Sequence, residues 1–280
     1  MTKVKARQGF VYVMSAPGYS GVKIGRSDRA PHFRAKELSA DPVYRQHGKW
    51  TVVDYRQVED MFATESALHR RFRSVNEIQY EPARELFRLS KSEAVEALLE
   101  TAEAGLLGAA PLGRLRLDRD LVDYLLRLFR ETGLSQFMDL QEMWTMSLYP
   151  STASGRYFTL NIDRHEVAFS APLRGTGKSV HMIYLDPRIL DNEMTYEWFD
   201  ARDGQVSTGD YLSAADAGCS VSWIGTLSDA VTFFDLPMAR RAVIAYWYDS
   251  LLNLRDRGKR SFFARFHNHN AVQELSRLAS

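Results

Sequence analysis

The sequence has 280 residues, 45% of them apolar and 25% charged, as expected for a globular protein with one large domain or two ordinary ones. No apolar run approaches the roughly 18–20 residues that cross a bilayer, so we expect no membrane-spanning segment. The single cysteine, Cys219, excludes an internal disulfide and a multi-cysteine zinc site, and we expect a cytoplasmic protein.

The net charge of +1 conceals a difference between two parts of the chain. Residues 1–92 carry 17 Lys and Arg against 10 Asp and Glu, a net charge of +7. Residues 93–280 carry 19 against 25, a net charge of −6. A basic region suits a protein that binds the phosphate backbone of a nucleic acid, although this much charge is also common in proteins with other functions.

Alternating strand and helix patterns fill the N-terminal part of the chain. Period-two alternation predicts strands, and capping residues or apolar i,i+4 pairs predict helices. We expect strands at 9–14 and 22–26 joined by turn formers at 15–21, a helix from Pro31 to about Ser39, a strand at 50–58, a helix at 64–73, a strand at 85–89, and a helix from Ser90 to about Ala104. Ser90 and Glu93 form a capping box at the start of that last helix.

A linker and a second domain follow. Residues 104–113 are small, rich in glycine and nearly uncharged, as is typical of a linker. We therefore place one domain at residues 1–103 and another at residues 114–280. The second domain begins with an amphipathic helix. Its apolar face holds Leu121, Leu125, Leu128 and Phe129.

Strand-like segments dominate the middle of the second domain. They lie near residues 157–170, 179–185, 194–200, 219–224 and 230–235. Pro237 then opens a long helix that is predicted to reach about Leu254, and a last helical stretch ends the sequence. Both domains are thus predicted to be α+β, the second as an antiparallel meander flanked by helices.

A set of residues in the first domain carries the strongest functional signal. Eleven residues after Tyr12, the end of the triplet Phe10-Val11-Tyr12, comes the triplet Lys23-Ile24-Gly25. They are followed by Arg34 in the first predicted helix, by Glu65 and His69 four residues apart in the second, and by Arg84-Glu85-Leu86-Phe87. In order and spacing, this set resembles the GIY-YIG nuclease family over residues 8–100, in the branch whose second triplet reads Lys-Ile-Gly.

The resemblance implies a small sheet-plus-helices domain that hydrolyses phosphodiester bonds with one divalent metal ion, Mg²⁺ or Mn²⁺. It implies that Glu85 holds the metal, because Mg²⁺ is commonly bound by one or two carboxylates. Tyr12 is then the general base that acts on a metal-bound water. Lys23 lowers the pKa of that phenol and touches the phosphate.

Further residues of the set have roles in binding and positioning. Arg34 presents a planar guanidinium that matches phosphate oxygens, and Arg26 joins Lys23 and Arg34 as a nucleic-acid contact. His69 positions water or donates to the leaving group. Gly25 lets the backbone or the substrate approach closely. Each residue alone has a commoner structural explanation, and the ordered set carries the interpretation.

The sequence also departs from the family pattern. Phe10 stands where the first triplet usually has glycine, and Leu38 stands where a histidine usually follows the helical arginine. We infer that His69 takes the role of that histidine. These departures affect the identity of the general base more than the fold.

Three segments of the second domain resemble functional motifs without meeting their requirements. Residues 174–179 look like part of a phosphate-binding loop but lack its first glycine, so we expect a hairpin loop. Residues 267–270 alternate histidine and asparagine, and we expect them on the surface. Residues 255–266 interleave basic and aromatic residues, which suits nucleic-acid contact, although a helix with one apolar and one basic face is the simpler account.

The sequence thus predicts a metal-dependent endonuclease, with DNA favoured over RNA as substrate. We expect residues 114–280 to supply targeting or regulation, in a role in bacterial defence or conflict. The second domain faintly resembles immunity proteins of bacterial toxin systems. The alternative is a protein-binding protein that uses residues 114–280 for its partner and carries an accessory nucleic-acid-binding module.

Overall fold

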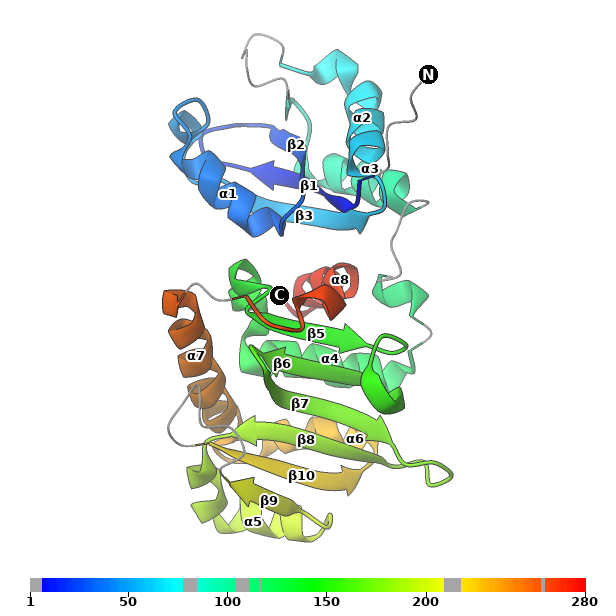
Figure 1. Ribbon diagram of the computed structural model, residues 1–280, viewed down its shortest axis with the longest axis vertical. Helices are drawn as coiled ribbons and strands as arrows, with labels where there is room; N and C mark the ends of the chain where they lie inside the picture. The colour runs from blue at the N-terminus through cyan, green and yellow to red at the C-terminus, as the bar shows by residue number, and fades with distance from the viewer. Residues whose placement is uncertain (1–6, 78–84, 104–110, 116, 209–217, 258–259) are drawn as a thin grey trace. The chain divides into compact units, whose positions relative to one another are not determined.

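The computed structural model describes residues 7–77, 85–103, 111–115, 117–208, 218–257 and 260–280. The chain divides into two compact units, residues 1–110 (unit 1) and 111–280 (unit 2). Each unit has its own antiparallel sheet with flanking helices (Figure 1), so the α+β prediction is confirmed. No described helix has the length and hydropathy needed to cross a membrane.

The division between the units falls within the segment that we expected to be a linker. Residues 104–110 of that segment lie outside the described residues. Residues 111–113 belong to unit 2, where Leu112–Arg114 form a short 3₁₀ turn. The Leu112 N–H donates a hydrogen bond of 2.5 Å to Glu274 Oε2, which attaches this turn to unit 2.

The sheet of unit 1 has the strand order β3-β1-β2-β4. Its strands are β1 (Gly9–Ser15), β2 (Val22–Ser27), β3 (Thr51–Val58) and β4 (Leu86–Phe87). β1 and β2 form the predicted hairpin, and β3 pairs with the other side of β1. The strand predicted at residues 85–89 is shorter than expected, because β4 pairs with β2 through two residues alone.

Helices cover both faces of this sheet. They are α1 (Pro31–Ala40), α2 (Met61–Arg71) and α3 (Lys91–Glu103). Alternate side chains of β1 point to opposite faces of the sheet and belong to two separate cores. Val11, Val13, Ile24, Leu68, Phe87 and Leu98 form the core beneath α2 and α3, whereas Phe10, Tyr12, Met14, Leu38, Trp50 and Tyr55 form the core beneath α1.

Capping interactions fix where two of these helices begin. The Asp60 carboxylate accepts hydrogen bonds from the N–H groups of Phe62 and Ala63, so α2 starts three residues before the predicted position. The predicted capping box is present at α3. The Ser90 N–H donates to Glu93 Oε2 at 3.0 Å, and the Glu93 N–H donates to Ser90 Oγ at 3.2 Å.

Unit 2 is built on a six-stranded antiparallel sheet with the strand order β5-β6-β7-β8-β10-β9. The strands are β5 (Trp144–Leu148), β6 (Phe158–Ile162), β7 (His165–Pro172), β8 (Ser179–Leu185), β9 (Gln205–Thr208) and β10 (Cys219–Gly225). The helices are α4 (Arg119–Thr132), α5 (Glu193–Asp200), α6 (Leu227–Thr232), α7 (Ala239–Arg257) and α8 (His269–Ala279).

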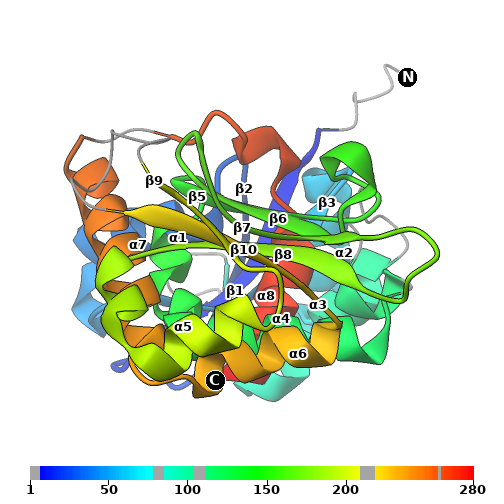
Figure 2. The ribbon, with the colours of Figure 1, turned by 90° about the horizontal axis from the view of Figure 1, so that it is seen from below.

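One face of this sheet is covered by helices and the other is largely open (Figures 1 and 2). The apolar side of α4 is buried as predicted, and its Tyr124 and Phe129 rings contact Phe158 and Trp144. Phe199 of α5 packs on Trp223 of β10 from the same side. On the opposite face, alternate residues such as Ser147, Thr159, Phe169, Ser220 and Ser222 remain partly exposed.

Several predictions for unit 2 were wrong. The segments predicted as strands at 194–200 and 230–235 are helical, in α5 and in α6 with the turn after it. Residues 157–170 contain two strands, β6 and most of β7, joined by a tight turn. β5 and β9 were not predicted.

The predictions for two of the motif-like segments differ in how they compare with the structure. Residues 174–179 form the β7–β8 hairpin loop, as predicted, closed by a 2.9 Å hydrogen bond from the Leu173 N–H to the Lys178 carbonyl. The prediction that residues 267–270 lie on the surface was wrong, because all four are buried. His267 Nδ1 accepts a hydrogen bond from the Met146 N–H, and the Asn268 N–H donates to the Met146 carbonyl, so this segment covers the edge of β5.

Candidate active site

The β1–β2 hairpin places several predicted site residues on one face of the sheet. Tyr12 lies opposite Gly25, and Lys23 shares this face because it is two residues from Gly25 along the strand. Glu85 lies just before β4, and its carbonyl oxygen accepts a 3.0 Å hydrogen bond from the Ile24 N–H. Side chains from three segments distant in sequence therefore meet at the end of this hairpin.

Gly25 explains how close these groups come to one another. A Cβ atom built on Gly25 would lie 2.7 Å from the Tyr12 hydroxyl oxygen and 3.2 Å from Glu85 Oε2. Both separations are tighter than ordinary van der Waals contacts. The phenol and the carboxylate thus converge over the Gly25 Cα, where a side chain would collide with both.

Lys23 is a fully buried amine with an acidic and an aromatic neighbour. Its Nζ forms an ion pair with Glu85 Oε2 and lies 5.0 Å from the centre of the Tyr44 ring. Burial, together with the charge of Arg34, lowers the pKa of Lys23 to about 7. The Glu85 carboxylate favours the charged amine, so the protonation of Lys23 depends on Glu85 remaining beside it.

Arg34 projects from α1 to Tyr12 and forms a hydrogen bond with its phenol. The guanidinium also donates to Glu37 Oε2 at 3.0 Å and is 40% exposed, so it remains accessible to a phosphate group. Burial raises the pKa of Tyr12 to about 12, and Arg34 opposes this rise. We expected Lys23 to lower the pKa of Tyr12, but the cation that has this effect is Arg34.

His69 approaches β2 from α2, which packs on the face of the sheet opposite Tyr12. Its Nε2 forms a 3.0 Å hydrogen bond with the Ile24 carbonyl, and its ring packs 5.0 Å from that of Phe87. A carbonyl can only accept, so Nε2 carries the proton and Nδ1 is an acceptor in the neutral ring. Burial and the charges of Lys23 and Arg26 lower the pKa of His69, which favours this neutral form.

Arg26 has a neighbour that sequence reasoning did not assign to it. It forms an ion pair with Glu65, whose side chain is 4% exposed, and its guanidinium lies 4.1 Å from the centre of the Phe62 ring. Glu65 therefore faces Arg26, and the two residues join α2 to the end of β2. A nucleic-acid contact by Arg26 has to compete with this ion pair.

Tyr44 is the main site residue that sequence reasoning missed. Its ring lies beside the Lys23 ammonium, it is 9% exposed, and burial raises its pKa. Trp50 holds it in place, since Trp50 Nε1 donates a 2.9 Å hydrogen bond to the Tyr44 carbonyl. Tyr44 lies outside any motif, between α1 and β3, so no sequence signal distinguishes it from an ordinary core aromatic.

Glu85 is the carboxylate best suited to a divalent metal ion. Its side chain is 35% exposed and faces the space that Gly25 leaves free. Mg²⁺ is commonly held by one or two carboxylates together with waters and substrate phosphates, and a single accessible carboxylate fits that donor set. In the described ranges, no group of three or more His, Cys, Asp and Glu side chains could enclose a metal ion.

Residues 9–102 match the T5orf172 domain, a domain associated with endonucleases. The match covers about a third of the chain and stops short of unit 2. No curated protein and no solved structure matches the chain. Unit 1 therefore contains a T5orf172 domain, and its nuclease-like character agrees with the convergence of Tyr12, Lys23 and Glu85 at the β1–β2 hairpin.

Proposed function

We propose that unit 1 is a metal-dependent endonuclease of the GIY-YIG type, which hydrolyses phosphodiester bonds of DNA. The observation that carries this proposal is the meeting of the Tyr12 phenol, the Lys23 amine and the Glu85 carboxylate over Gly25. Burying an amine and a phenol next to each other lowers the stability of the fold. Buried polar groups of this kind are typical of catalytic sites.

Arg34 is the proposed phosphate contact, and the buried Lys23 acts on the phosphate through its charge. Arg34 is partly exposed beside Tyr12, so its remaining N–H groups can donate to the oxygens of a bound phosphate. Lys23 is buried beneath Glu85 and adds positive charge where negative charge grows during the reaction. The net charge of +7 over residues 1–92 favours the approach of a polyanion.

Glu85 is the proposed ligand of Mg²⁺ or Mn²⁺. A divalent ion supplies charge neutralisation at the phosphate and activation of water. Glu85 contacts Lys23 and faces the Gly25 surface, so it can hold an ion next to a phosphate that Arg34 binds. The carboxylate that binds the ion is thus the same one that stabilises the charged form of Lys23.

Two groups are candidates for accepting the proton of the attacking water. Tyr12 is the proposed general base, and its high pKa means that it begins the reaction protonated and must lose its proton beside Arg34. Neutral His69, with Nδ1 as an acceptor, is the alternative. The two groups predict different dependences of the rate on pH, which distinguishes them.

Unit 2 is proposed to target or regulate the nuclease. Phosphate contacts within unit 1 carry no sequence information, so selectivity has to come from another surface. A role in bacterial defence or conflict, and a protein partner bound through residues 114–280, belong to the same proposal. The family resemblance and the separate compact unit support it.

Incubation with supercoiled plasmid DNA tests the proposed activity. We expect nicked and linear products with Mg²⁺ or Mn²⁺, no products with a chelator, and a large loss of rate in Arg34→Ala. Lys36→Ala is the matched control, because it removes another cation from α1. DNA binding without cleavage in either metal would instead favour a protein-binding function with an accessory nucleic-acid-binding module.

A further inference from the structure

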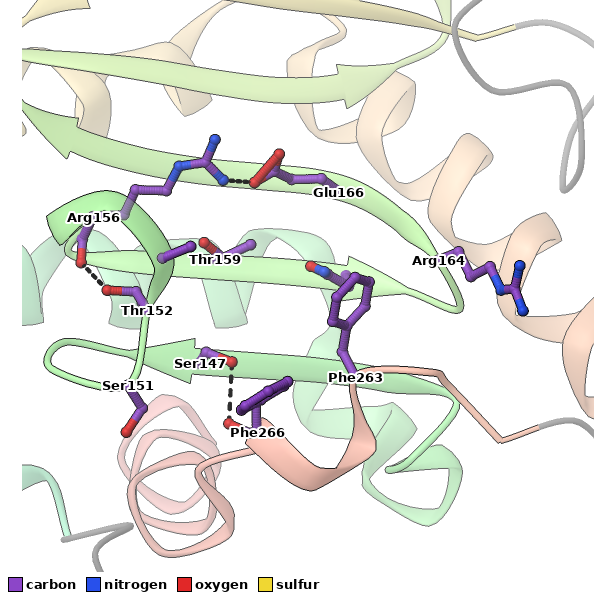
Figure 3. Close-up of a pocket in the computed structure, with 11 residues that line it drawn as sticks. Ser147, Ser151, Thr152, Arg156, Thr159, Arg164, Glu166, Phe263 and Phe266 are labelled. Atoms are coloured by element: carbon purple, nitrogen blue, oxygen red, sulfur yellow. Dashed lines mark hydrogen bonds and ion pairs between the residues drawn. The ribbon is translucent and has the colours of Figure 1, made fainter.

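We propose that the open face of the unit 2 sheet binds unpaired bases of a nucleic-acid strand, in a cavity at β5, β6 and β7. The inference rests on the proposed function, because it supplies the contact through which unit 2 would target the nuclease. The cavity has a volume of about 520 Å³ (Figure 3). Its lining comes from the three strands, from the β5–β6 connection and from the segment that precedes α8.

Asn161 gives the clearest sign that the cavity holds a ligand. It lies on β6 among the lining residues and is 6% exposed, and its Oδ1 has no hydrogen-bond partner in the described part of the chain. A buried acceptor without a partner is costly, and a ligand that donates a hydrogen bond removes that cost. The amino and imino groups on the base-pairing edge of an unpaired nucleobase are such donors.

Aromatic side chains at the cavity offer surfaces for base stacking. Phe263 and Phe266 line it, and Figure 3 shows both rings directed toward the strands. Phe266 is 41% exposed, and the Arg265 guanidinium lies 4.5 Å from the centre of its ring. An aromatic face backed by arginine is the platform on which single-stranded nucleic acids stack their bases.

Two arginines at opposite ends of the cavity suit the phosphates on either side of a stacked base (Figure 3). Arg156 forms an ion pair with Glu166, and its guanidinium lies 4.0 Å from the centre of the Phe169 ring. Arg164 is exposed, at the turn between β6 and β7. Polar and aromatic groups lie between the two cations. The cavity therefore fits a nucleic-acid strand, which offers both bases and phosphates, better than a ligand that offers negative charge alone.

Hydrogen bonds to the sheet hold the aromatic segment in place. The Ser261 hydroxyl donates to the Asp163 carbonyl at 2.7 Å, and the Ser147 hydroxyl donates to the Phe266 carbonyl at 3.0 Å. The Asn268 N–H donates to the Met146 carbonyl at 2.9 Å. A platform that is fixed before binding loses little conformational entropy on contact with a ligand.

Residues 255–266 therefore do not form one continuous amphipathic helix, contrary to our expectation. α7 ends at Arg257, and Ala264–Phe266 form a short 3₁₀ turn. Phe262 is 61% exposed rather than packed on an apolar face. In sequence, residues 255–266 carry five basic residues and one acidic residue within a unit that has 19 basic and 21 acidic residues in all. Of these basic residues, Arg265 lies beside the lining residue Phe266.

Binding of a fluorescent single-stranded DNA of mixed sequence to the full-length chain tests the proposal. The Glu85→Gln variant is used with a chelator, so that the DNA stays intact and binding is measured independently of cleavage. We expect tighter binding of the single strand than of the matching duplex. Phe266→Ala should weaken the single-strand complex by about 5- to 150-fold, the usual effect of removing one stacking aromatic. Asn161→Ala should weaken it without lowering the unfolding temperature, because it removes an acceptor that has no partner.

Matched controls lie on the same unit. Tyr196→Ala removes an aromatic that is 61% exposed on α5, and Arg174→Ala removes a cation from the β7–β8 loop, so neither should change binding. Equal affinity of Phe266→Ala, Asn161→Ala and the parent would overturn the proposal. So would equally tight binding of a free nucleotide, which would assign the cavity to a small ligand. If the chain bound the single strand through the cavity but did not cut plasmid DNA, this inference would stand. Only the proposed nuclease activity would then be contradicted.

Discussion

The two sheets of this protein expose different kinds of surface, and the difference determines what their sequences reveal. Unit 1 has helices on both faces of its sheet, so Lys23 and Tyr12 are buried and each needs a specific neighbour. Unit 2 leaves one face of its sheet largely open, where hydroxyl and aromatic side chains remain partly exposed. A buried reactive group constrains residue type and spacing, whereas an open face does not.

The same difference appears in the arginines. In unit 1, Arg34 is joined to Tyr12 and Glu37, so its position follows from the site around it. In unit 2, Arg156 and Arg164 stand at the ends of a cavity whose shape comes from two connections far apart in sequence. We therefore expect a single substitution in the site of unit 1 to remove most of its activity. A single substitution at the cavity of unit 2 should reduce ligand binding only in part.

After loss of the proposed metal ligand Glu85, the largest effect is expected for Tyr12→Phe, which removes the phenol that converges with Glu85 over Gly25. The rate of cleavage should fall by about 10²–10⁴, the usual contribution of a general base. Tyr55→Phe is the control, because Tyr55 lies opposite Tyr12 on β3 and packs in the same core. Single-turnover cleavage of plasmid DNA measures both variants. A similar loss in both would indicate damage to the core rather than loss of a catalytic group.

Gly25→Ala should lower the rate by about 10², because a misplacement of roughly 1 Å at a reacting group has an effect of that size. The new Cβ would lie 2.7 Å from the Tyr12 hydroxyl oxygen, and the Tyr12 side chain is buried in the core beneath α1. Gly113→Ala is the matched control, because nothing lies within 4 Å of a Cβ at that position. A fully active Gly25→Ala enzyme would show that Tyr12 and Glu85 need not converge.

The dependence of the rate on pH distinguishes Tyr12 from His69. Burial raises the pKa of Tyr12 to about 12, so a rate limited by its phenolate should rise about tenfold per pH unit from pH 7 to 9.5. Burial lowers the pKa of His69 below its ordinary value of 6.5, so a rate limited by neutral His69 would be constant over that range. We expect the rising profile, and we expect His69→Gln to retain it. A plateau above pH 6.5 would assign proton transfer to His69.

A smaller effect is expected on the acid stability of unit 2. Burial lowers the pKa of His267 from 6.5 to about 3, so folding favours the neutral ring that accepts from the Met146 N–H. The stabilisation is complete above pH 6.5 and is lost as the pH falls toward 3, because the unfolded chain then binds the proton more readily. His267→Asn keeps an acceptor without the titration. Its urea midpoint should fall less between pH 7 and 4.5 than that of the parent.

Tryptophan emission is a suitable measure of that midpoint, because four of the five tryptophans lie in unit 2. His181 titrates in the same unit with a pKa of about 4, so the variant should retain part of the pH dependence. Identical pH dependence in the variant and the parent would mean that His267 can be protonated without unfolding the β5 edge.

Much of unit 1 could be predicted from the sequence. The β1–β2 hairpin follows from alternation and turn residues, and the grouping of Tyr12, Lys23 and Glu85 is what the resemblance to the GIY-YIG family implied. Tyr44 and the Arg26–Glu65 pair could not be predicted, because they depend on how α1 and α2 lie against β2. Contacts of that kind are set by packing and leave no periodic signal.

The errors in unit 2 also have physical causes. Residues 194–200 contain three aromatic residues, which favour strands, but the Asn192 side chain accepts from the Thr195 N–H and starts a helix. The helix at 227–232 has the capping box of Thr226 and Asp229, a signal that the strand prediction overlooked. β9 is exposed at every residue, so it has no burial pattern to detect.

The role of Glu85 is the central claim, and the cleavage rate of Glu85→Gln across a titration of Mg²⁺ and Mn²⁺ tests it most directly. The substitution keeps the size of the side chain and removes the charge that would hold the metal ion. Glu96→Gln, on the exposed side of α3, is the matched control. We predict no detectable cleavage by Glu85→Gln at any metal concentration, with an unfolding temperature close to that of the parent and full activity in the control. Turnover near that of the parent at low Mg²⁺ would contradict the account, because the metal would then be held without Glu85.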